Sequence, residues 1–565
     1  MFHTMQPLTP DSDFFDEVTG LSDDEPLPLP ERFARIKRKL IAGHEAAVAD
    51  SFRRLLGELR AEASRVAAAG SDAVPTIDFL DIDDPARAAA FARDLRRRGV
   101  AVIRRVVPPG VAAAWGEETR EYIAQSPLRP PPGYPAADPQ MFDLYWSPGQ
   151  VRARADSRML AAQRFVMRAA WRSGGGGGGN GDSEALVSTN YPVSYADRFR
   201  IRRPGDTSMG VGPHMDGGSV ERWESDGYGR GGGSGGSVGT YGRIFEGRWE
   251  DHDPWDADAR LAATSDLYNG AGACSMFRMF QGWLTLSTAA PGEGSLRVCP
   301  MLRLATAYVL LRPFFSPVRP ASSFPSRSRP KRKPKLNPNY GTDTDDFGSD
   351  SDDSDDPEYY ESDTGFLRAD NWALQARPDS VVQGAVPGRA QELSDAAHPH
   401  LRLRRTLVPV PRVEPGDYVV WHPDAVHAAD PAHAGPSDAT ALYVPACPLT
   451  TTNALYLARQ RRAFLLGQPA PDFGGGGGGG GGVGGAGGVG VGIGGGVESI
   501  HLGRPGVQDI NDAGGEEGLR AMGLLAFDER GASSRVEREV VALANGILFP
   551  DRFDICYKRG GGQPK

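Results

Sequence analysis

The stretch Pro415-Gly416-Asp417-Tyr418-Val419-Val420-Trp421-His422-Pro423-Asp424-Ala425-Val426-His427 carries the strongest structural signal in this sequence. Its Pro-Gly-Asp triplet is typical of a turn, and the four apolar residues that follow are typical of a short buried strand. A histidine closes the stretch shortly after that strand. The stretch therefore predicts a turn and a strand that lead to a chemically active side chain, His427.

A second motif, His214-Met215-Asp216, lies about two hundred residues upstream. Residues two apart in a strand point to the same side, so His214 and Asp216 can both reach one metal ion. The following Gly217-Gly218 lets the backbone turn away close to the site. With His427 as a third ligand from another strand, this is the two-histidine, one-carboxylate set that holds non-haem Fe(II) by one face and leaves the opposite positions open.

Other histidines are alternatives to this ligand set. His422 competes with His427 for the third position, although its place directly after the strand favours packing or a hydrogen bond beside the site. His398 and His400 form a His-Pro-His motif that could bind a metal, but a loop that enters a strand explains the motif more simply. His433 is expected to be a solvated loop residue.

Helical spacing of apolar residues covers 30–68, with a break at Gly43, and then 86–98 and 111–123. Short strands with Pro and Gly punctuation follow from about residue 196 and predict a jelly-roll or barrel rather than a parallel sheet. Helices that precede strands instead of alternating with them also disfavour a doubly wound fold. Strands are expected at Thr76–Ile82, Val100–Val107, Arg198–Arg203, Cys274–Ser287, Ser295–Val298, Leu401–Val410, Tyr418–Trp421 and Thr440–Val444.

The fold class predicted from these patterns is mainly β with α-helices, built around a jelly-roll core. The predicted divisions are a helical N-terminal cap at 1–95, the core at 96–465, a Gly-rich linker at 466–500 and a C-terminal extension at 501–565. Segments of biased composition that cannot bury enough apolar surface are expected to be disordered insertions in the core. They lie near 174–182, 225–240 and 316–365.

The formal net charge is −9, but Asp343–Asp363 alone contributes eleven acidic residues and no basic ones. The rest of the chain is therefore close to neutral and lacks the basic footprint of a nucleic-acid-binding protein. The four cysteines include no Cys-x-x-Cys pair, which argues for a reducing compartment without a disulfide framework or zinc ribbon.

Neither a secretory signal nor a run of about 18 apolar residues is visible, so no membrane span is expected and a cytoplasmic location is predicted. The basic run at 329–335 resembles a nuclear localisation signal, which makes a nuclear location the alternative. The other interpretation of this basic run is a disordered loop whose positive charge is balanced by the adjacent acidic run.

Several strings give this sequence a resemblance to a known family. The stretch that ends at His427, GVAVIRRVV at 99–107 and PGEGSLRVCP at 291–300 resemble core segments of the Fe(II)/2-oxoglutarate-dependent dioxygenases. Longer strings resemble an uncharacterised bacterial and fungal family, domain of unknown function 1479, that is grouped with those enzymes. These are GPHMDGGSVERWE, DPWDA, FRMFQGWLTLS, LRPFF and CPLTTTNALYLARQRRAF, and the likeness covers about 25–565 outside the insertions.

The resemblance implies a double-stranded β-helix, the cupin-like form of the jelly-roll, with iron bound by His214, Asp216 and His427. It implies an oxidoreductase in which Fe(II) and 2-oxoglutarate activate dioxygen, so that a small-molecule substrate is hydroxylated while succinate and carbon dioxide are released. A carboxylate ligand at Asp216 fits hydroxylation, because halogenating relatives have a small residue there.

One departure from the superfamily pattern concerns the 2-oxoglutarate anchor. Most members place an Arg or Lys shortly after the distal histidine, but here none follows His427 until Arg459. An Arg suits bidentate recognition of a carboxylate. The candidates are Arg278 first, Arg297 second and Arg200 third, with Thr440 or Tyr443 assisting.

Arg278 is preferred because an unpaired guanidinium in its apolar surroundings would be costly. The alternative is a buried ion pair of Arg278 with Asp253 or Asp256.

The missing conventional anchor also leaves two rival functions open. One is a jelly-roll protein that binds a metal or a carboxylate without catalysis, and the other is a metal-dependent oxygenase that does not use 2-oxoglutarate. No oligomeric state is predicted.

Overall fold

The computed structural model describes residues 28–173, 186–229, 239–264, 267–268, 274–324, 365–473 and 497–552. The predicted insertion at 174–182, the glycine tract within 225–240, most of 316–365 and most of the linker at 466–500 lie outside the described residues. The first residues of the third insertion are described, and Phe315–Pro317 forms a strand there. The division into cap, core, linker and extension stays a prediction.

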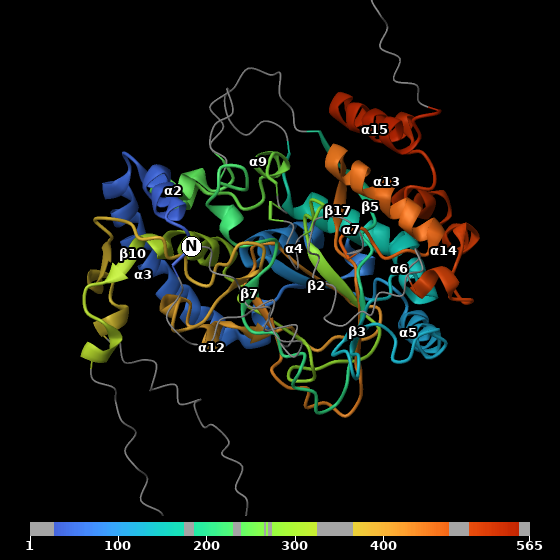
Figure 1. Cartoon of the computed structure of the whole chain (residues 1–565), viewed down its shortest axis with the longest axis horizontal. Coiled ribbons are helices and arrows are strands. Elements are labelled where there is room, and N and C mark those ends of the chain that lie inside the picture. Colours follow the sequence, from blue (N-terminus) through green and yellow to red (C-terminus); the bar gives the residue numbers. More distant parts are fainter. Residues whose placement is uncertain are drawn as a thin grey trace, which may run out of the picture.

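The described chain is a mixed α/β structure with two larger sheets (Figure 1). The eight-stranded sheet has the order β1-β2-β14-β8-β16-β6-β4-β3, and the five-stranded sheet has the order β12-β7-β15-β9-β13. The strands of the first sheet are β1 (Thr76–Asp78), β2 (Val100–Arg104), β3 (Gly133–Tyr134), β4 (Met141–Phe142), β6 (Phe199–Arg202), β8 (Gln281–Thr285), β14 (Tyr418–Trp421) and β16 (Ala439–Tyr443). Those of the second are β7 (His214–Met215), β9 (Leu296–Val298), β12 (Gln391–Glu392), β13 (Val408–Pro409) and β15 (His427–Ala429).

Two strand pairs complete the β-structure of the described residues. They are β5 (Val187–Val193) with β17 (Cys447–Thr450), and β10 (Phe315–Pro317) with β11 (Trp372–Leu374). The helices are α2 (Arg32–Ile41), α3 (Glu45–Ala69), α4 (Pro85–Arg98), α5 (Pro109–Ala124), α6 (Pro148–Ala155), α7 (Ser157–Ala170), α8 (Gly242–Phe245), α9 (Asp258–Leu261), α10 (Leu302–Leu311), α12 (Leu403–Thr406), α13 (Thr451–Leu466), α14 (Val507–Ala521) and α15 (Arg535–Leu548).

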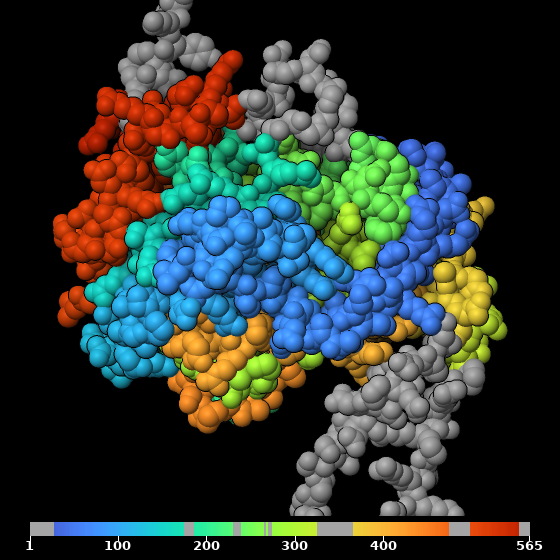
Figure 2. Space-filling view, turned by 180° about the vertical axis from the view of Figure 1, so that it is seen from behind, coloured from blue at the N-terminus to red at the C-terminus, as the bar shows by residue number. Residues whose placement is uncertain are grey.

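The N-terminal and C-terminal helices lie at opposite ends of the molecule. Helices α2 and α3 lie at one end, and α13, α14 and α15 lie at the other (Figure 1). Seen from behind, the N-terminal segments in blue cover much of one face, and the C-terminal segment in red lies to one side of them (Figure 2). Helix α3 shares the main hydrophobic cluster with both sheets, whereas α13 and α15 pack with β5 and β17 in a second cluster.

The Pro-Gly-Asp turn fixes the start of β14 against β2. Gly416 has a φ of +90°, and a Cβ there would meet the carbonyl oxygen of Val107 at 1.9 Å, so only glycine fits. The carboxylate of Asp417 accepts hydrogen bonds from the backbone N–H of Arg105 at 2.9 Å and from the Arg104 guanidinium at 2.7 Å. These contacts hold β14 between β2 and β8, in the middle of the sheet.

Several local predictions are confirmed. The helix predicted over 30–68 breaks at Gly43, which has a φ of +81°. Helix α4 begins after Asp84, whose carboxylate caps two backbone N–H groups, and ends at the left-handed Gly99. No helix in the described ranges is both long enough and apolar enough to span a membrane.

Three predicted strands are wrong in extent or type. The strand predicted over Thr76–Ile82 ends at Asp78, and Phe79–Asp81 forms a 3-10 helix. Only Gln281–Thr285 of the run predicted over Cys274–Ser287 forms a strand. Within Leu401–Val410, residues Leu403–Thr406 form the short helix α12, and only Val408–Pro409 pairs as a strand. In the runs over Cys274–Ser287 and Leu401–Val410, many apolar residues are buried in irregular or helical segments. A short apolar sequence does not by itself distinguish such a segment from a strand.

Candidate metal centre

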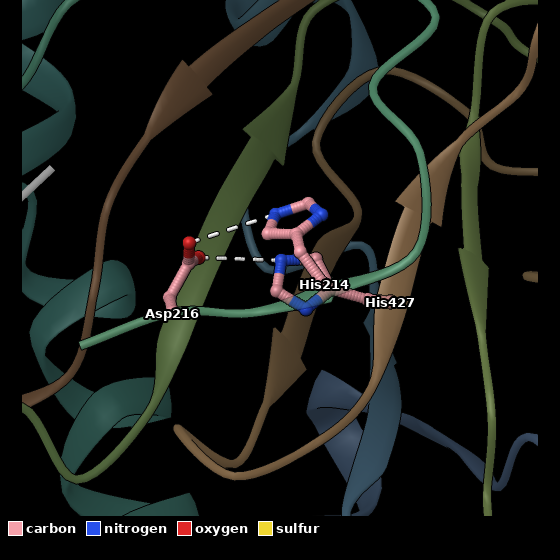
Figure 3. Close-up of side chains that lie close together, drawn as sticks. All are labelled: His214, Asp216 and His427. Atoms are coloured by element: carbon pink, nitrogen blue, oxygen red, sulfur yellow. Dashed lines mark ion pairs between the residues drawn. The ribbon is translucent and has the colours of Figure 1, made fainter. Parts of the chain in front are cut away.

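The five-stranded sheet brings the three predicted ligands together. His214 on β7 lies directly opposite His427 on β15, and the centroids of their rings are 4.2 Å apart. Asp216 follows β7 and turns its carboxylate toward both imidazoles (Figure 3). Its Oδ1 lies 3.5 Å from Nε2 of His214, and its Oδ2 lies 3.3 Å from Nε2 of His427.

Backbone carbonyls fix the orientation of the two imidazoles. Nδ1 of His214 lies 2.7 Å from the carbonyl oxygen of Gly212, and Nδ1 of His427 lies 3.0 Å from that of Ala425. A neutral imidazole that donates its Nδ1–H to a carbonyl keeps its lone pair on Nε2. Both Nε2 atoms are therefore the ones available to a metal, and they are also the atoms that face Asp216.

The electrostatics favour a neutral His214 beside an ionised Asp216. Burial, and then the neighbouring His427, lower the pKa of His214 to about 4. Burial by itself raises the pKa of Asp216, but the nearby His214 and His427 outweigh it and bring the net pKa below its usual range. A neutral imidazole and a carboxylate are the protonation states that metal binding requires.

The donor set fits one divalent transition-metal ion. The three ligand atoms lie within 4.8 Å of one another. Metal bonds to imidazole nitrogen and carboxylate oxygen are about 2 Å long, which brings adjacent ligand atoms to about 3 Å from each other. The two nitrogen–oxygen separations are only slightly larger. Two histidines and one carboxylate with the opposite side open are the ligands that suit non-haem Fe(II).

Two of the competing histidines, His422 and His400, are engaged elsewhere, whereas the buried His398 has no partner for either ring nitrogen among the described residues. His422 is fully buried, with Nε2 2.9 Å from the carbonyl oxygen of Pro254 and Nδ1 accepting from the backbone N–H of Asp424. Both of its nitrogens are therefore used away from the triad, as the packing interpretation predicts. His400 likewise uses both nitrogens, one with Tyr308 and one with a backbone carbonyl.

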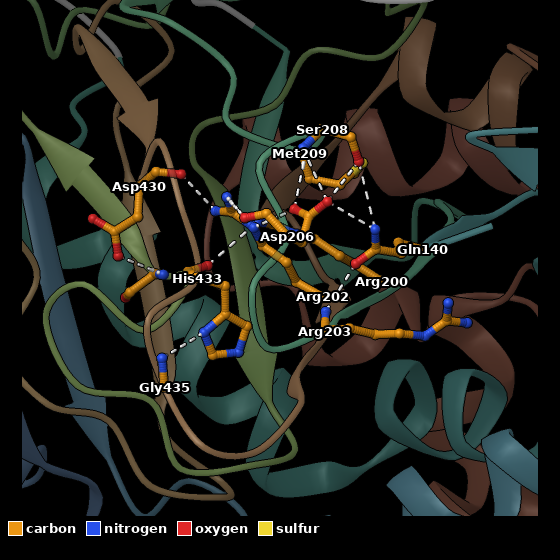
Figure 4. A network of polar contacts seen from close by, with 12 residues as sticks. Gln140, Arg200, Arg202, Arg203, Asp206, Ser208, Met209, Asp430, His433 and Gly435 are labelled. Atoms are coloured by element: carbon orange, nitrogen blue, oxygen red, sulfur yellow. Dashed lines mark hydrogen bonds and ion pairs between the residues drawn. The ribbon is translucent and has the colours of Figure 1, made fainter. Parts of the chain in front are cut away.

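The prediction for His433 is wrong. Its side chain is 1% exposed, and its backbone carbonyl accepts from the N–H of Gly205 (Figure 4). It belongs to a buried network in which Arg202 donates from Nε to Asp206 at 2.8 Å and from Nη1 to the carbonyl oxygen of Asp430 at 2.6 Å. The Gly, Pro and Ser residues around His433 indicated a loop correctly, but that loop packs against β6 instead of facing solvent.

Arg278 lies near Asp216 and forms no ion pair with any residue that the structure describes. Its half-buried guanidinium lies 5.7 Å from the ring of Tyr195, and among the described residues it forms no hydrogen bond or ion pair. It is close enough to lower the pKa of Asp216. The predicted alternative partner Asp253 is paired with Arg172 instead. A cavity of about 290 Å³ is lined by Arg278 together with Gly217 and Gln281.

The second and third anchor candidates are placed differently. Arg297 is opposite Ala428, one residue out of phase with His427, so it points to the other face of the five-stranded sheet. Its guanidinium donates to the carbonyl oxygen of Leu407. Arg200 on β6 is buried, has its guanidinium 5.8 Å from the ring of Trp283 and forms no ion pair within the described chain.

The two assisting candidates lie on opposite faces of β16. Thr440 accepts a hydrogen bond from Arg120 of α5 at 2.8 Å, on the side of the sheet away from the triad. Tyr443 shares the inner face with Trp283, and their ring centroids are 6.4 Å apart. Of these candidates, Tyr443 therefore lies on the same face as Trp283, whereas Thr440 and Arg297 point away from the triad.

The structure also shows a cluster of charges that sequence reasoning missed. We call Asp424, Arg222, Arg260 and Tyr241 the Asp424 cluster. Asp424 accepts from Arg260 at 2.5 Å and from the hydroxyl of Tyr241 at 2.9 Å, and Arg222 lies 3.6 Å away. All four side chains are at most 4% exposed. The one indication of this cluster in the sequence was Asp424, an aspartate inside the largely apolar stretch that ends at His427.

Arg222 joins the two segments that carry the metal ligands. Its guanidinium donates to the carbonyl oxygen of Gly218 at 2.6 Å and to that of Asp216 at 2.8 Å. Through Asp424 it contacts the turn whose Ala425 carbonyl orients His427. The Asp424 cluster therefore fixes the distance between β7 with its following turn and the stretch that leads into β15.

Comparisons with known proteins agree with the family resemblance drawn from the sequence. A family model described as Gig2-like matches residues 27–524. The uncharacterised protein YbiU of Escherichia coli K12 is 28% identical over 422 residues, which are 73% of this chain and 82% of YbiU. GlcNAc Inducible Gene 2 (DUF1479) of Candida albicans has a TM-score of 0.69 and 26% identity, over 94% of this chain and 97% of that chain. A structure from Salmonella typhimurium LT2, described as that of a proposed oxidoreductase, has a TM-score of 0.64 and 26% identity, over 88% of this chain and 99% of that chain.

Proposed function

This chain belongs to the Gig2-like family, and we propose that it is a non-haem Fe(II) oxygenase that uses 2-oxoglutarate to oxidise a small molecule. The observation that carries the proposal is the convergence of two Nε2 atoms and one carboxylate at the spacing of a single ion. The Salmonella relative described as a proposed oxidoreductase supports the same reaction class.

The strand order supports a double-stranded β-helix as the finer description of the fold. Consecutive strands of the core alternate between the sheets: β6 lies in the eight-stranded sheet, β7 in the other, β8 in the first and β9 in the second. The later strands β13, β14, β15 and β16 also alternate between the two sheets. In the eight-stranded sheet β14 and β16 flank β8, and in the five-stranded sheet β13 and β15 flank β9. This interleaving of two antiparallel runs is the arrangement expected of a jelly-roll.

Each side chain of the site has a defined role in this proposal. His214, Asp216 and His427 hold Fe(II), which together with 2-oxoglutarate and dioxygen supplies the oxidising chemistry. The carbonyls of Gly212 and Ala425 keep the imidazoles in the tautomer that offers Nε2 to the metal. The open side of the triad is where the substrate and dioxygen would approach.

Arg278 is the proposed anchor for the distal carboxylate of 2-oxoglutarate. A half-buried guanidinium without a counter-ion is unfavourable unless a ligand supplies one. Arg278 meets that condition at the edge of a cavity that reaches Gly217, the residue after the carboxylate ligand. Arg200 is a second buried guanidinium without a counter-ion among the described residues, but the space beside it is only about 20 Å³.

The proposal is tested by calorimetric titration of the purified protein with Fe(II) under anaerobic conditions, followed by 2-oxoglutarate. Arg278→Ala should bind Fe(II) as the wild type does and bind 2-oxoglutarate about 10- to 100-fold more weakly, because a charge-assisted contact is lost. Arg278→Lys should recover part of that affinity, since it keeps the charge but not the planar fork.

A matched control is Arg203→Ala, which removes an exposed guanidinium paired with Asp138 and should change neither titration. Unchanged 2-oxoglutarate binding in Arg278→Ala would contradict the anchor assignment. Iron binding by the wild type without any affinity for 2-oxoglutarate would favour a metal-binding protein, or an oxygenase that does not use this co-substrate.

A further inference from the structure

Three buried N–H donors on one face of the eight-stranded sheet have no hydrogen-bond partner among the described residues. They are Nε2 of Gln281 and the indole Nε1 atoms of Trp283 and Trp421. The three side chains are 4%, 5% and 4% exposed, so solvent at the surface does not satisfy them. We call these three residues the donor face.

The strand register places the three side chains on one face of the sheet, and Trp421 lies next to the proposed ligand His427. Gln281 on β8 is opposite Trp421 on β14, and Trp283 is two residues farther along the same face. The rings of Trp283 and Trp421 have centroids 6.0 Å apart, and that of Trp421 lies 5.3 Å from the ring of His427. The donor face therefore looks across the space between the two sheets toward His427.

Most other buried tryptophans of the described chain do not share this feature, although the indole N–H of Trp171 also lacks a partner there. The indole N–H of Trp223 donates to the carbonyl oxygen of Leu310, that of Trp249 to Ser51, and that of Trp146 to Gln468. Buried donors are bonded in most structures, and an unbonded one costs free energy. Three unbonded donors gathered beside a metal ligand are better explained by a ligand than by packing.

The chemistry of these groups specifies what they bind. Indole and amide N–H groups donate to oxygen acceptors such as carboxylate or carbonyl oxygens. Gln281 also lines the 290 Å³ cavity that contains the unpaired guanidinium of Arg278. Arg278 supplies a positive charge and Gln281 an oriented neutral donor on the same cavity wall, which together suit a carboxylate.

We propose that Gln281, Trp283 and Trp421 form a carboxylate-binding subsite that, with Arg278, selects an organic acid with a second carboxylate at the metal centre. This inference rests on the proposed function and adds to it. It assigns selectivity for a 2-oxo dicarboxylate over a 2-oxo monocarboxylate to three neutral side chains in the protein interior, in place of the basic residue that is missing after His427.

The test compares two probes, 2-oxoglutarate and pyruvate, which share the metal-chelating 2-oxo acid group and differ in the distal carboxylate. Affinities of the Fe(II)-loaded protein for both acids are measured without oxygen in Gln281→Leu, Trp283→Phe and Trp421→Phe. Trp223→Phe is the matched control, because its indole already has a backbone partner. The ratio of the two affinities removes any change in iron binding that the variants share.

Gln281→Leu and Trp421→Phe should each lower the preference for 2-oxoglutarate over pyruvate by about tenfold, because each removes one donor to a charged oxygen. Gln281→Glu should lower it further, since a second negative charge then faces the carboxylate. Trp223→Phe should leave the preference unchanged. Thermal melts of all variants establish that each is folded before its ratio is interpreted.

Three results would overturn the inference. If the preference is unchanged in all donor-face variants, 2-oxoglutarate is bound without these residues, and the proposed function stands alone. If both acids weaken equally, the donor face acts on the metal-chelating end or on packing and does not read the distal carboxylate. If the wild-type protein binds iron but neither acid, the proposed function and this inference fail together.

Discussion

The Asp424 cluster and the donor face are both buried and polar, and both lie next to the proposed metal ligands, but they differ in how their polar groups are satisfied. Both carboxylate oxygens of Asp424 accept hydrogen bonds from neighbouring side chains. The three N–H donors of Gln281, Trp283 and Trp421 find no acceptor within the described chain. The first arrangement is complete without a ligand, and the second is not.

This difference separates scaffold from binding site without reference to any relative. A satisfied buried ion cluster holds segments in register, whereas unsatisfied donors near a metal centre are available to an incoming molecule. Arg222 and Arg278 illustrate the contrast. The first donates to two backbone carbonyls of the ligand-bearing turn, whereas the second lies beside the ring of Tyr195 and forms no hydrogen bond among the described residues.

The largest expected effect is on Fe(II) binding and concerns Asp216, the proposed carboxylate ligand. Asp216→Ala should abolish Fe(II) binding, because it removes the only anionic member of the triad. Anaerobic calorimetry measures this directly. Asp138→Ala, at an exposed carboxylate paired with Arg203, is the control and should bind iron normally. Normal iron binding by Asp216→Ala would contradict the metal site, and the Asp424 cluster and the donor face would then not lie beside a metal centre.

The next effect is on stability and concerns the Asp424 cluster. Asp424→Ala leaves the buried guanidiniums of Arg222 and Arg260 without their carboxylate, which should lower the free energy of unfolding by about 3–5 kcal/mol. Chemical denaturation monitored by circular dichroism measures the change. By contrast, Trp421→Phe on the donor face should cost far less stability. Equal losses in the two variants would mean that the donor face is also scaffold.

A smaller effect is expected on metal affinity when Arg222 is altered. Arg222→Lys keeps the positive charge near Asp424 but cannot donate to the carbonyls of both Gly218 and Asp216, so the ligand-bearing turn is held less firmly. Iron affinity should fall about 10- to 100-fold, as for other residues that orient metal ligands. Retention of full iron affinity in a folded Arg222→Lys protein would show that the cluster only stabilises the fold.

The smallest effect is a pH dependence at a third buried polar site. Burial raises the pKa of Glu498 to about 7, although its carboxylate accepts from the backbone N–H groups of Tyr145 and Trp146 and from the hydroxyl of Tyr122. The folded protein therefore holds this proton more tightly than the unfolded chain does. The resulting stabilisation is fully present below about pH 4.5 and is lost as the pH rises through about 7.

Glu498→Gln should flatten this part of the stability profile, because the glutamine side chain does not titrate. Denaturation at intervals between pH 4.5 and 7.5 compares the variant with the wild type. If the wild type and Glu498→Gln lose stability in parallel over that range, Glu498 is not the titrating group.

The grouping of His214, Asp216 and His427 could be predicted from the sequence because each segment carries its own local signal. His214 and Asp216 are two residues apart, and the stretch ending at His427 carries its own turn and strand signals. The register that makes His214 and His427 direct neighbours is non-local, but each segment by itself already limits where its histidine can lie. The iron and 2-oxoglutarate assignments remain proposals.

The surroundings of the site could not be predicted to the same extent. Arg222 and Asp424 are separated by about two hundred residues, and nothing in either local pattern indicates their contact. The face of Arg297 depends on the pairing of β9 with β15, which places Val298 and not Arg297 opposite His427. Apolar composition also misled the strand prediction over Leu401–Val410, where burial is achieved partly by the helix α12.

An anaerobic optical titration of the protein with Fe(II) and then 2-oxoglutarate tests whether the triad forms a 2-oxoglutarate-dependent iron centre. We expect a visible charge-transfer band on addition of 2-oxoglutarate to the iron-loaded wild type, and no band in His214→Ala. A protein that binds iron but never develops the band would contradict the assignment as a 2-oxoglutarate oxygenase. A protein that does not bind iron at all would contradict the metal centre formed by His214, Asp216 and His427.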